Sequence, residues 1–299
     1  MAKRLKKTNK TQLELFNERP VENDRNYHLG GKSFYFFDFD DNVATLATTI
    51  VIFHKVTGHE IHLSSADFAL YHREIGISGN FSDYYIDFND EKGSFRNFRD
   101  QRFATFDKIK GKKQRFIEDI KEALNKKDFD WKAPSWNCFF HAVHNQRPMS
   151  VITARGHEPE TIKKGIDLLV KNGHLSKTPN YLSIYPVSNP EIKKSLSGGD
   201  MNASVADLKR GAIRESVEKA IEKYGYSDHH RFGMSDDDGH NVELITEEMK
   251  SLKQDYPEMS FFVIQTFKDS FTKTEVLQHK TRDIITKKES KADQLHLFL

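Results

Sequence analysis

The sequence has little that would form a covalent cross-link or cross a membrane. Cys138 is the single cysteine among 299 residues, which excludes an intramolecular disulfide and fits a reducing compartment. No apolar run reaches the roughly 18 residues of a membrane-spanning helix, and the basic start is not followed by the apolar stretch of a signal peptide. We therefore expect a soluble, cytoplasmic protein with no membrane partner.

An excess of charge of one sign is also lacking. Lys and Arg number 46 and Asp and Glu 44, which leaves a formal net charge of only +2. This balance gives no electrostatic indication that nucleic acid is the main ligand. What the chain does have is apolar surface, with 37% hydrophobic residues and 23 Phe. That is enough for one large domain, or for a core domain that carries an insert.

Five short apolar runs predict buried strands. Because the runs are continuous rather than alternating, they are typical of a parallel sheet covered on both faces. Patterns with helix start and stop signals separate several of them, at 158–173, 205–225 and 241–257. Strands that alternate with helices predict a doubly wound α/β fold. The expected strands are 34–39, 149–153, 181–187, 230–235 and 261–267.

A long interval separates the first two of these strands. Residues 48–64 have the pattern of two strands joined at Thr57-Gly58, which predicts a hairpin. Residues 65–148 then predict an inserted, mainly helical module. On this interpretation the core comprises 31–64 and 149–272, between flexible polar tails at 1–30 and 273–299.

The first strand runs directly into acidic residues, in "FYFFDFDDN". Residues two apart on an extended backbone point the same way, so Asp38 and Asp40 can face one site. In open α/β sheets ligands bind at the carboxyl ends of the strands, where these acids lie. Two close carboxylates repel each other, and a site that keeps them holds a cation or separates their protonation states. The alternative is a solvated turn, because Asp and Asn are common turn residues.

Polar residues also follow the later strands. The second strand ends in Thr153, a helix begins near Lys209, and the fourth strand ends in the acids 236–238. Carboxylates are the oxygen ligands that Mg²⁺ prefers. A hydroxyl and an ammonium group offset charge on phosphoryl oxygens. Together these residues predict a site for a divalent cation and a phosphoryl group.

In their order and separations, these motifs resemble the haloacid dehalogenase superfamily of phosphohydrolases. The resemblance covers residues from about 33 to 267. It implies a Rossmann-like core, in which the hairpin at 48–64 is the family's flap and the insert at 65–148 is its cap domain. Each motif alone is weak, and the specificity comes from finding four of them in order.

The resemblance also implies a role for each residue. Asp38 would be the nucleophile that forms an aspartyl-phosphate, and Asp40 would give and take the proton. Thr153 and Lys209 would bind the phosphoryl group. Mg²⁺ would be held by the Asp38 carboxylate, the Asp40 backbone carbonyl and an acid from 236–237. The expected protein is a Mg²⁺-dependent phosphatase that hydrolyses a small phosphorylated substrate.

The chain departs from the family pattern in two places. Asn42 stands where Thr or Val is usual, and the last motif holds three consecutive acids. Among these acids we expect Asp236 first and Asp237 second as metal ligands. We expect Lys209 as the phosphate-binding lysine because it begins a strong helix. The competing residues are Asp238, Lys193 and Lys194.

A short motif occurs once near each end of the chain. Gln12–Phe16 reads QLELF and Gln294–Phe298 reads QLHLF. Both resemble the peptide by which bacterial replication and repair proteins bind the sliding clamp. If they function, a nucleotide or DNA end becomes the expected substrate, and a non-catalytic, clamp-tethered interaction protein is the alternative to an enzyme. Otherwise the tails fold back over the core's own apolar surface.

Overall fold

The computed structural model describes residues 20–104, 111–267, 270–278 and 280–288. Over these residues the chain is a mixed α/β protein with eight α-helices and a seven-stranded, mostly parallel main sheet. The strands of this sheet, in chain order, are β1 (Ser33–Phe37), β5 (Pro148–Thr153), β6 (Asn180–Pro186), β7 (Arg231–Asp236), β8 (Ser260–Phe267), β9 (Ser270–Val276) and β10 (Thr281–Lys288).

The direction in which strands are added to the main sheet reverses at β1. Across the sheet the order is β10-β9-β8-β7-β1-β5-β6, and the five strands from β8 to β6 are parallel. These five are the strands predicted from the apolar runs. The chain first builds outward from β1 through β5 to β6, and then crosses to the other side of β1 to build β7 and β8. The carboxyl ends of β1 and β7 therefore flank the switch point at which such sheets bind ligands.

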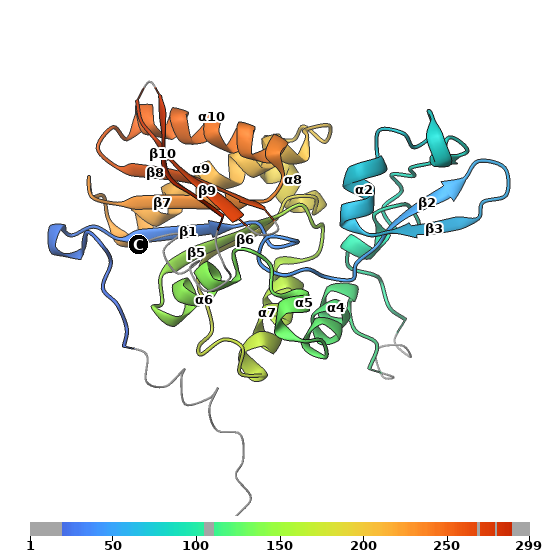
Figure 1. The fold of residues 1–299 in the computed structure, drawn as a ribbon, viewed down its shortest axis with the longest axis horizontal. Coiled ribbons are helices and arrows are strands. Elements are labelled where there is room, and N and C mark those ends of the chain that lie inside the picture. The colour runs from blue at the N-terminus through green and yellow to red at the C-terminus, as the bar shows by residue number, and fades with distance from the viewer. Residues whose placement is uncertain (1–19, 105–110, 268–269, 279, 289–299) are drawn as a thin grey trace, which may run out of the picture.

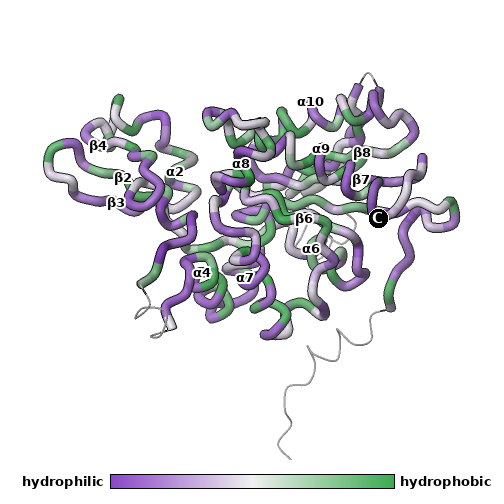
Figure 2. The backbone as a smooth tube through the Cα atoms, turned by 180° about the vertical axis from the view of Figure 1, so that it is seen from behind, coloured by the Kyte–Doolittle hydropathy of each residue, from purple (hydrophilic) through white to green (hydrophobic). Residues whose placement is uncertain are grey.

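Helices cover both faces of the main sheet (Figure 1). Alternate side chains of β1 divide between two buried clusters, with Phe34 and Phe36 on one face and Tyr35 and Phe37 on the other. Figure 2 shows the hydrophobic residues concentrated along these central strands. The first face is covered by α9 and α10 and the second by α4 to α7. The helices are α4 (Arg115–Leu124), α5 (Asp128–Trp131), α6 (Trp136–His144), α7 (Pro159–Lys171), α8 (Pro190–Leu196), α9 (Val205–Tyr224) and α10 (Gly239–Asp255).

A second, smaller sheet lies apart from the main sheet, on the right of Figure 1. The predicted hairpin forms its strands β2 (Ile50–His54) and β3 (Glu60–Leu63), and Gly58 in the turn has a φ of 68°. Strand β4 (Tyr84–Tyr85) pairs with the free edge of β2, and α2 (Ser65–Tyr71) follows β3. A small apolar cluster around Ile52 is separate from the two main ones. We call residues 49–98 the inserted module.

The rest of the predicted insert belongs to the main body of the protein. Phe116 on α4 and Phe139 on α6 are buried in the same cluster as Phe37 of β1. Helix α4 packs against α7, which covers the main sheet. The insert was predicted to extend to residue 148 because the stretch before the second apolar run has helical patterns. Amphipathic periodicity shows that a helix has a buried face, but does not show which sheet that face covers.

The structure corrects the predicted tails where it describes them. Near the N-terminus, the Asp24 carboxylate accepts a hydrogen bond from the Ser33 amide at 2.8 Å and pairs with Arg147 at 2.9 Å. The tail predicted over 273–299 is wrong for β9 and β10, which extend the main sheet in antiparallel fashion. Strand β9 buries Phe271, Lys273 and Val276, and its other side chains are half-buried.

Both terminal peptides, Gln12–Phe16 and Gln294–Phe298, lie outside the described residues. In the part of the chain that the structure describes, none of the helices is both long and apolar enough to span a membrane.

Candidate active site

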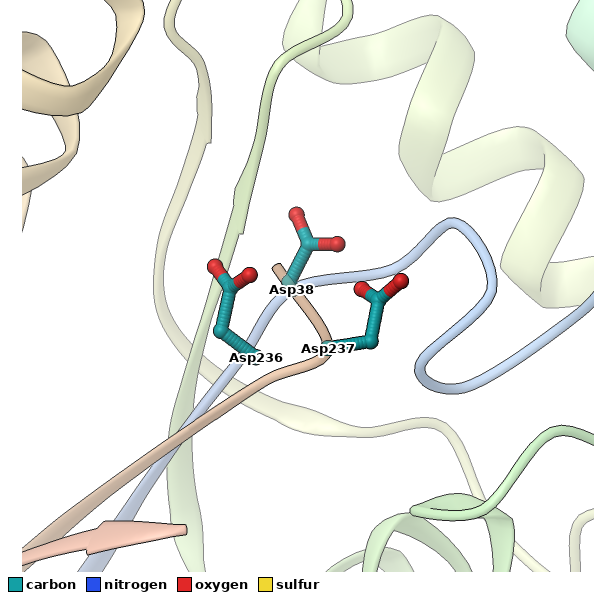
Figure 3. A group of neighbouring side chains, drawn as sticks. All are labelled: Asp38, Asp236 and Asp237. Atoms are coloured by element: carbon teal, nitrogen blue, oxygen red, sulfur yellow. The ribbon is translucent and has the colours of Figure 1, made fainter. Parts of the chain in front are cut away.

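Three acidic residues meet at the switch point of the main sheet. Asp38 follows β1 directly and Asp236 ends β7, and the Asp38 amide donates to the Ser235 carbonyl at 3.0 Å. Because the two strands are parallel neighbours, their ends bring the side chains together. One carboxylate oxygen from each of Asp38, Asp236 and Asp237 lies within 4.8 Å of the others. Figure 3 shows the three carboxylates pointing to the same side of the loops that carry them.

Lys209 joins two of these acids. It lies in the first turns of α9, and its Nζ donates to Asp38 Oδ1 at 3.0 Å and to Asp236 Oδ2 at 2.7 Å. All three side chains are buried. Burial disfavours the charged ammonium, but the two carboxylates outweigh it and raise the pKa of Lys209 above its ordinary value. Lys209 therefore stays charged and offsets part of the acidic charge.

One lysine does not neutralise three acids. Burial, together with the charges of Asp236 and Asp237, raises the pKa of Asp38 well above its usual range despite the opposing charge of Lys209. Burial and the charge of Asp236 raise the pKa of Asp237 to about 7. Oxygen donors with uncompensated negative charge suit a hard divalent cation. The side chains in this cluster could therefore hold a divalent metal ion.

Asp238, the third acid of the run, has a different position. Its carboxylate caps the N-terminus of α10 by accepting from the amides of His240, at 2.8 Å, and Asn241. Its own amide donates to Asp236 Oδ1 at 3.0 Å. The cluster around Asp38 thus contains Asp236 and Asp237, while Asp238 supports the helix that follows.

The Asp40 side chain belongs to a neighbouring group. Thr153, at the end of β5, donates from Oγ1 to Asp40 Oδ2 at 3.3 Å. Arg155 donates from Nε to Asp40 Oδ2 at 2.8 Å and from Nη2 to Asp40 Oδ1 at 2.6 Å. The chain turns sharply after Asp40, where Asp41 has a φ of 54°. A left-handed residue is well tolerated as Asp, whose short side chain bonds locally.

The structure therefore distributes the predicted residues over two adjoining groups. Asp38, Lys209, Asp236 and Asp237 form one, and Asp40 with Thr153 forms the other. The competing lysines, Lys193 and Lys194, lie on α8, and neither is bonded to these acids in the described structure. Arg155 was not among the residues predicted from the sequence. A cation two residues beyond Thr153, at the same strand end, was the available signal.

Asn42 connects the acidic turn to the strands beside it. Its Nδ2 donates to the Asp38 carbonyl at 3.0 Å and to Ser235 Oγ at 2.8 Å. Its Oδ1 accepts from the hydroxyls of Ser135 and Thr266, both at 2.9 Å. Asn42 is fully buried, and its amide supplies both donors and acceptors to satisfy four groups. This gives a structural reason for Asn at this position, because Thr has fewer hydrogen-bonding atoms.

Comparison with known proteins adds no relative to this description. No family model matches the chain, and neither does any curated protein or solved structure. The case for a function therefore depends on the residues gathered at the carboxyl ends of β1, β5 and β7.

Proposed function

We propose that the protein is a Mg²⁺-dependent phosphatase that hydrolyses a phosphomonoester through an aspartyl-phosphate on Asp38. In this proposal it is a member of the haloacid dehalogenase superfamily, with a Rossmann-like core and a cap formed by residues of the inserted module. The main support is the contact of Lys209 with both Asp38 and Asp236 at the switch point. Buried ionisable groups with perturbed pKa values, gathered at the ligand-binding edge of an α/β sheet, are typical of a functional site.

Asp38 supplies the nucleophile. Lys209 bonds its Oδ1, so that the carboxylate is held in one orientation and Oδ2 is available to attack phosphorus. The new bond from Asp38 to phosphorus forms as the bond from phosphorus to the leaving oxygen breaks. A water molecule then attacks the phosphorus, releases phosphate and restores the carboxylate. The Lys209 ammonium offsets charge on the phosphoryl oxygens during both steps.

Asp40 transfers the proton. It lies two residues from the nucleophile, on the same turn, and its side chain is 22% exposed, so a substrate can reach it. It protonates the leaving oxygen in the first step and accepts a proton from the attacking water in the second. Thr153, whose hydroxyl donates to Asp40, would turn this hydroxyl to a phosphoryl oxygen when substrate binds.

The metal would be held by Asp38, Asp236 and Asp237, together with the Asp40 backbone carbonyl. When bound, Mg²⁺ would offset the repulsion between an anionic carboxylate and an anionic phosphate. The raised pKa values of Asp38 and Asp237 support this assignment, because they result from burial of the carboxyl groups and from the negative charge of the neighbouring acids.

Turnover of an aryl phosphate tests the proposal. We expect the wild-type protein to release phosphate with Mg²⁺ and to lose this activity with EDTA. Asp38→Asn, which keeps the shape of the side chain and removes its nucleophilicity, should lower kcat by roughly a thousandfold or more. Asp238→Asn is the matched control, since Asp238 caps α10, and it should retain most of the activity. Equal activity in Asp38→Asn and the wild type would refute the assignment.

The alternative, a non-catalytic protein tethered to the sliding clamp, stays a prediction. Its two peptides lie outside the described residues, so the structure adds nothing for or against it.

A further inference from the structure

Arg155 grips Asp40 with two nitrogens of its guanidinium group. The bonds from Nε and Nη2 are 2.8 and 2.6 Å long. Arg155 is 0% exposed, whereas the Asp40 side chain reaches solvent. A planar guanidinium that meets a carboxylate in this way fixes both its position and its orientation. The solvent-accessible carboxylate of Asp40 is thus held in place by the buried guanidinium group of Arg155.

The two chain segments that lead into and out of the inserted module also meet at Arg155. On the way in, Thr48 Oγ1 accepts a hydrogen bond from Arg155 Nη2 at 2.6 Å. On the way out, the ring centroid of Phe98 lies 4.9 Å from the guanidinium carbon. The Gly156 amide, next along the chain, donates to the Phe98 carbonyl at 2.9 Å. Both connections of the module therefore contact one side chain or its neighbour.

Arg155 and Thr48 also contact helix α4 of the main body. The ring centroid of Phe116 on α4 lies 4.8 Å from the guanidinium carbon, so Arg155 also contacts the main body. The Thr48 hydroxyl donates to the carboxylate of Asp119, also on α4, which leaves its lone pairs to accept from Arg155. Asp119 in turn pairs with Arg115 at 2.7 Å. The orientation of the Thr48 hydroxyl is thereby set by α4.

We infer that Arg155 is a positioning residue that couples the placement of the inserted module to the placement of Asp40. This inference rests on the proposed function, in which Asp40 transfers the proton. Arg155 is bonded to Asp40 and not to Asp38 or Lys209 in the described structure, so it acts through Asp40. A shift of the module moves Thr48 and Phe98, and this changes the position of the Arg155 guanidinium group. Because Arg155 is bonded to Asp40, the Asp40 carboxylate then moves as well. A substrate that moves the module on binding would in this way determine the position of the Asp40 carboxylate, the proposed proton donor.

The dependence of rate on the leaving group separates this role from a general structural one. An alkyl phosphate needs a proton on its leaving oxygen, whereas a dinitrophenyl phosphate leaves well without one. For Arg155→Gln we expect kcat/KM, which reports formation of the phosphoenzyme, to fall about 100-fold with the alkyl phosphate and less than about tenfold with the dinitrophenyl ester. Asp40→Asn should show the same pattern, and combining the two changes should cost little more than Asp40→Asn alone.

Thr48→Val tests the link to the module without removing the charge beside Asp40. This change keeps the shape of Thr48 and deletes the hydroxyl. We expect kcat/KM to depend on the leaving group in the same way as in Arg155→Gln, but to fall less, about tenfold for the alkyl phosphate. Arg147→Gln is the matched control. Arg147 is a buried arginine paired with Asp24 at 2.9 Å, beside the amino end of β5, and its loss should leave the pattern unchanged.

A second measurement does not depend on turnover. Amide hydrogen exchange of Gly156, whose N–H bonds the Phe98 carbonyl, should be faster in Arg155→Gln and Thr48→Val than in the wild type. The inference would be overturned if kcat/KM of a folded Arg155→Gln protein fell equally with both esters, or if exchange of the Gly156 amide were unchanged in both variants. Either result would leave the proposed function standing. A wild-type protein without phosphatase activity would overturn both.

Discussion

At the scale of the residue, the site is defined by charge that the protein does not balance. Lys209 lies between Asp38 and Asp236, while Asp237 adds a further acid at the solvent side. Burial of charged groups costs free energy of folding, and buried ionisable groups of this kind cluster at functional sites. A cation that binds here should therefore stabilise the folded state as well as support the chemistry.

The pH dependence of stability follows from Asp237. Its pKa is 3.8 in the unfolded chain and about 7 in the folded protein without metal. Between these values the folded state holds a proton that the unfolded state releases, so the free energy of unfolding falls as pH rises from about 4 to 7. Above about 7 both states are ionised and this contribution no longer changes.

Protons and Mg²⁺ compete for the same oxygens, so the metal should stabilise more at high pH. We expect saturating Mg²⁺ to raise Tm by several degrees at pH 8 and by much less at pH 5.5, measured by thermal unfolding. In Asp237→Asn the difference between the two pH values should shrink, while Asp238→Asn should behave as the wild type does. A Tm shift that is the same at both pH values would contradict this assignment.

At the scale of the element, Asn42 holds the acidic turn against its neighbours. Its side chain bonds the end of β1, the end of β7, β8 and the residue before α6. These elements are far apart in the sequence, and only the strand order brings them together. Correct placement of Asp38 relative to Asp236 depends on this connection.

Asn42→Ala should therefore destabilise the protein and displace Asp38, the proposed nucleophile. We expect a loss of about 3 kcal/mol in the free energy of unfolding, because several buried polar groups lose their partner. Asn42→Thr keeps one hydroxyl and should cost less. Thr266→Val removes a single bond to Asn42 and should cost about 1 kcal/mol. Urea unfolding measures all three, and an Asn42→Ala protein as stable as the wild type would show that the connection is dispensable.

The elements also show what periodicity can and cannot predict. Strands β1, β5, β7 and β8 were predictable because they are buried on both faces, so that their sequences are continuous apolar runs. Strand β6 is half-buried at the sheet edge, and it was predictable because its sequence is also largely apolar. Strands β9 and β10 were not, since polar residues are interspersed along both. Strand β10 is an edge strand, and such a sequence resembles a solvated tail. Helices α4 and α6 were recognisable as helices, but their packing on the main sheet depends on tertiary contacts.

At the scale of the whole molecule, the site exists only where separate segments converge. The grouping of Asp38, Lys209 and Asp236 could be proposed from sequence, because strand ends and a helix start are local signals. Arg155 could not, since its contacts with Asp40, Thr48 and Phe98 depend on how the inserted module joins the main body. Local patterns place residues on elements, whereas their bonding partners come from the complete fold.

The central claim is that Asp38 carries the phosphoryl group in a covalent intermediate. The most direct measurement is acid quenching during turnover with Mg²⁺ and an aryl phosphate, followed by borohydride reduction and mass spectrometry of the peptide that contains residues 33–42. We predict conversion of the phosphorylated aspartate to homoserine at Asp38. Modification at another residue, or none in a protein that is turning over, would contradict the account.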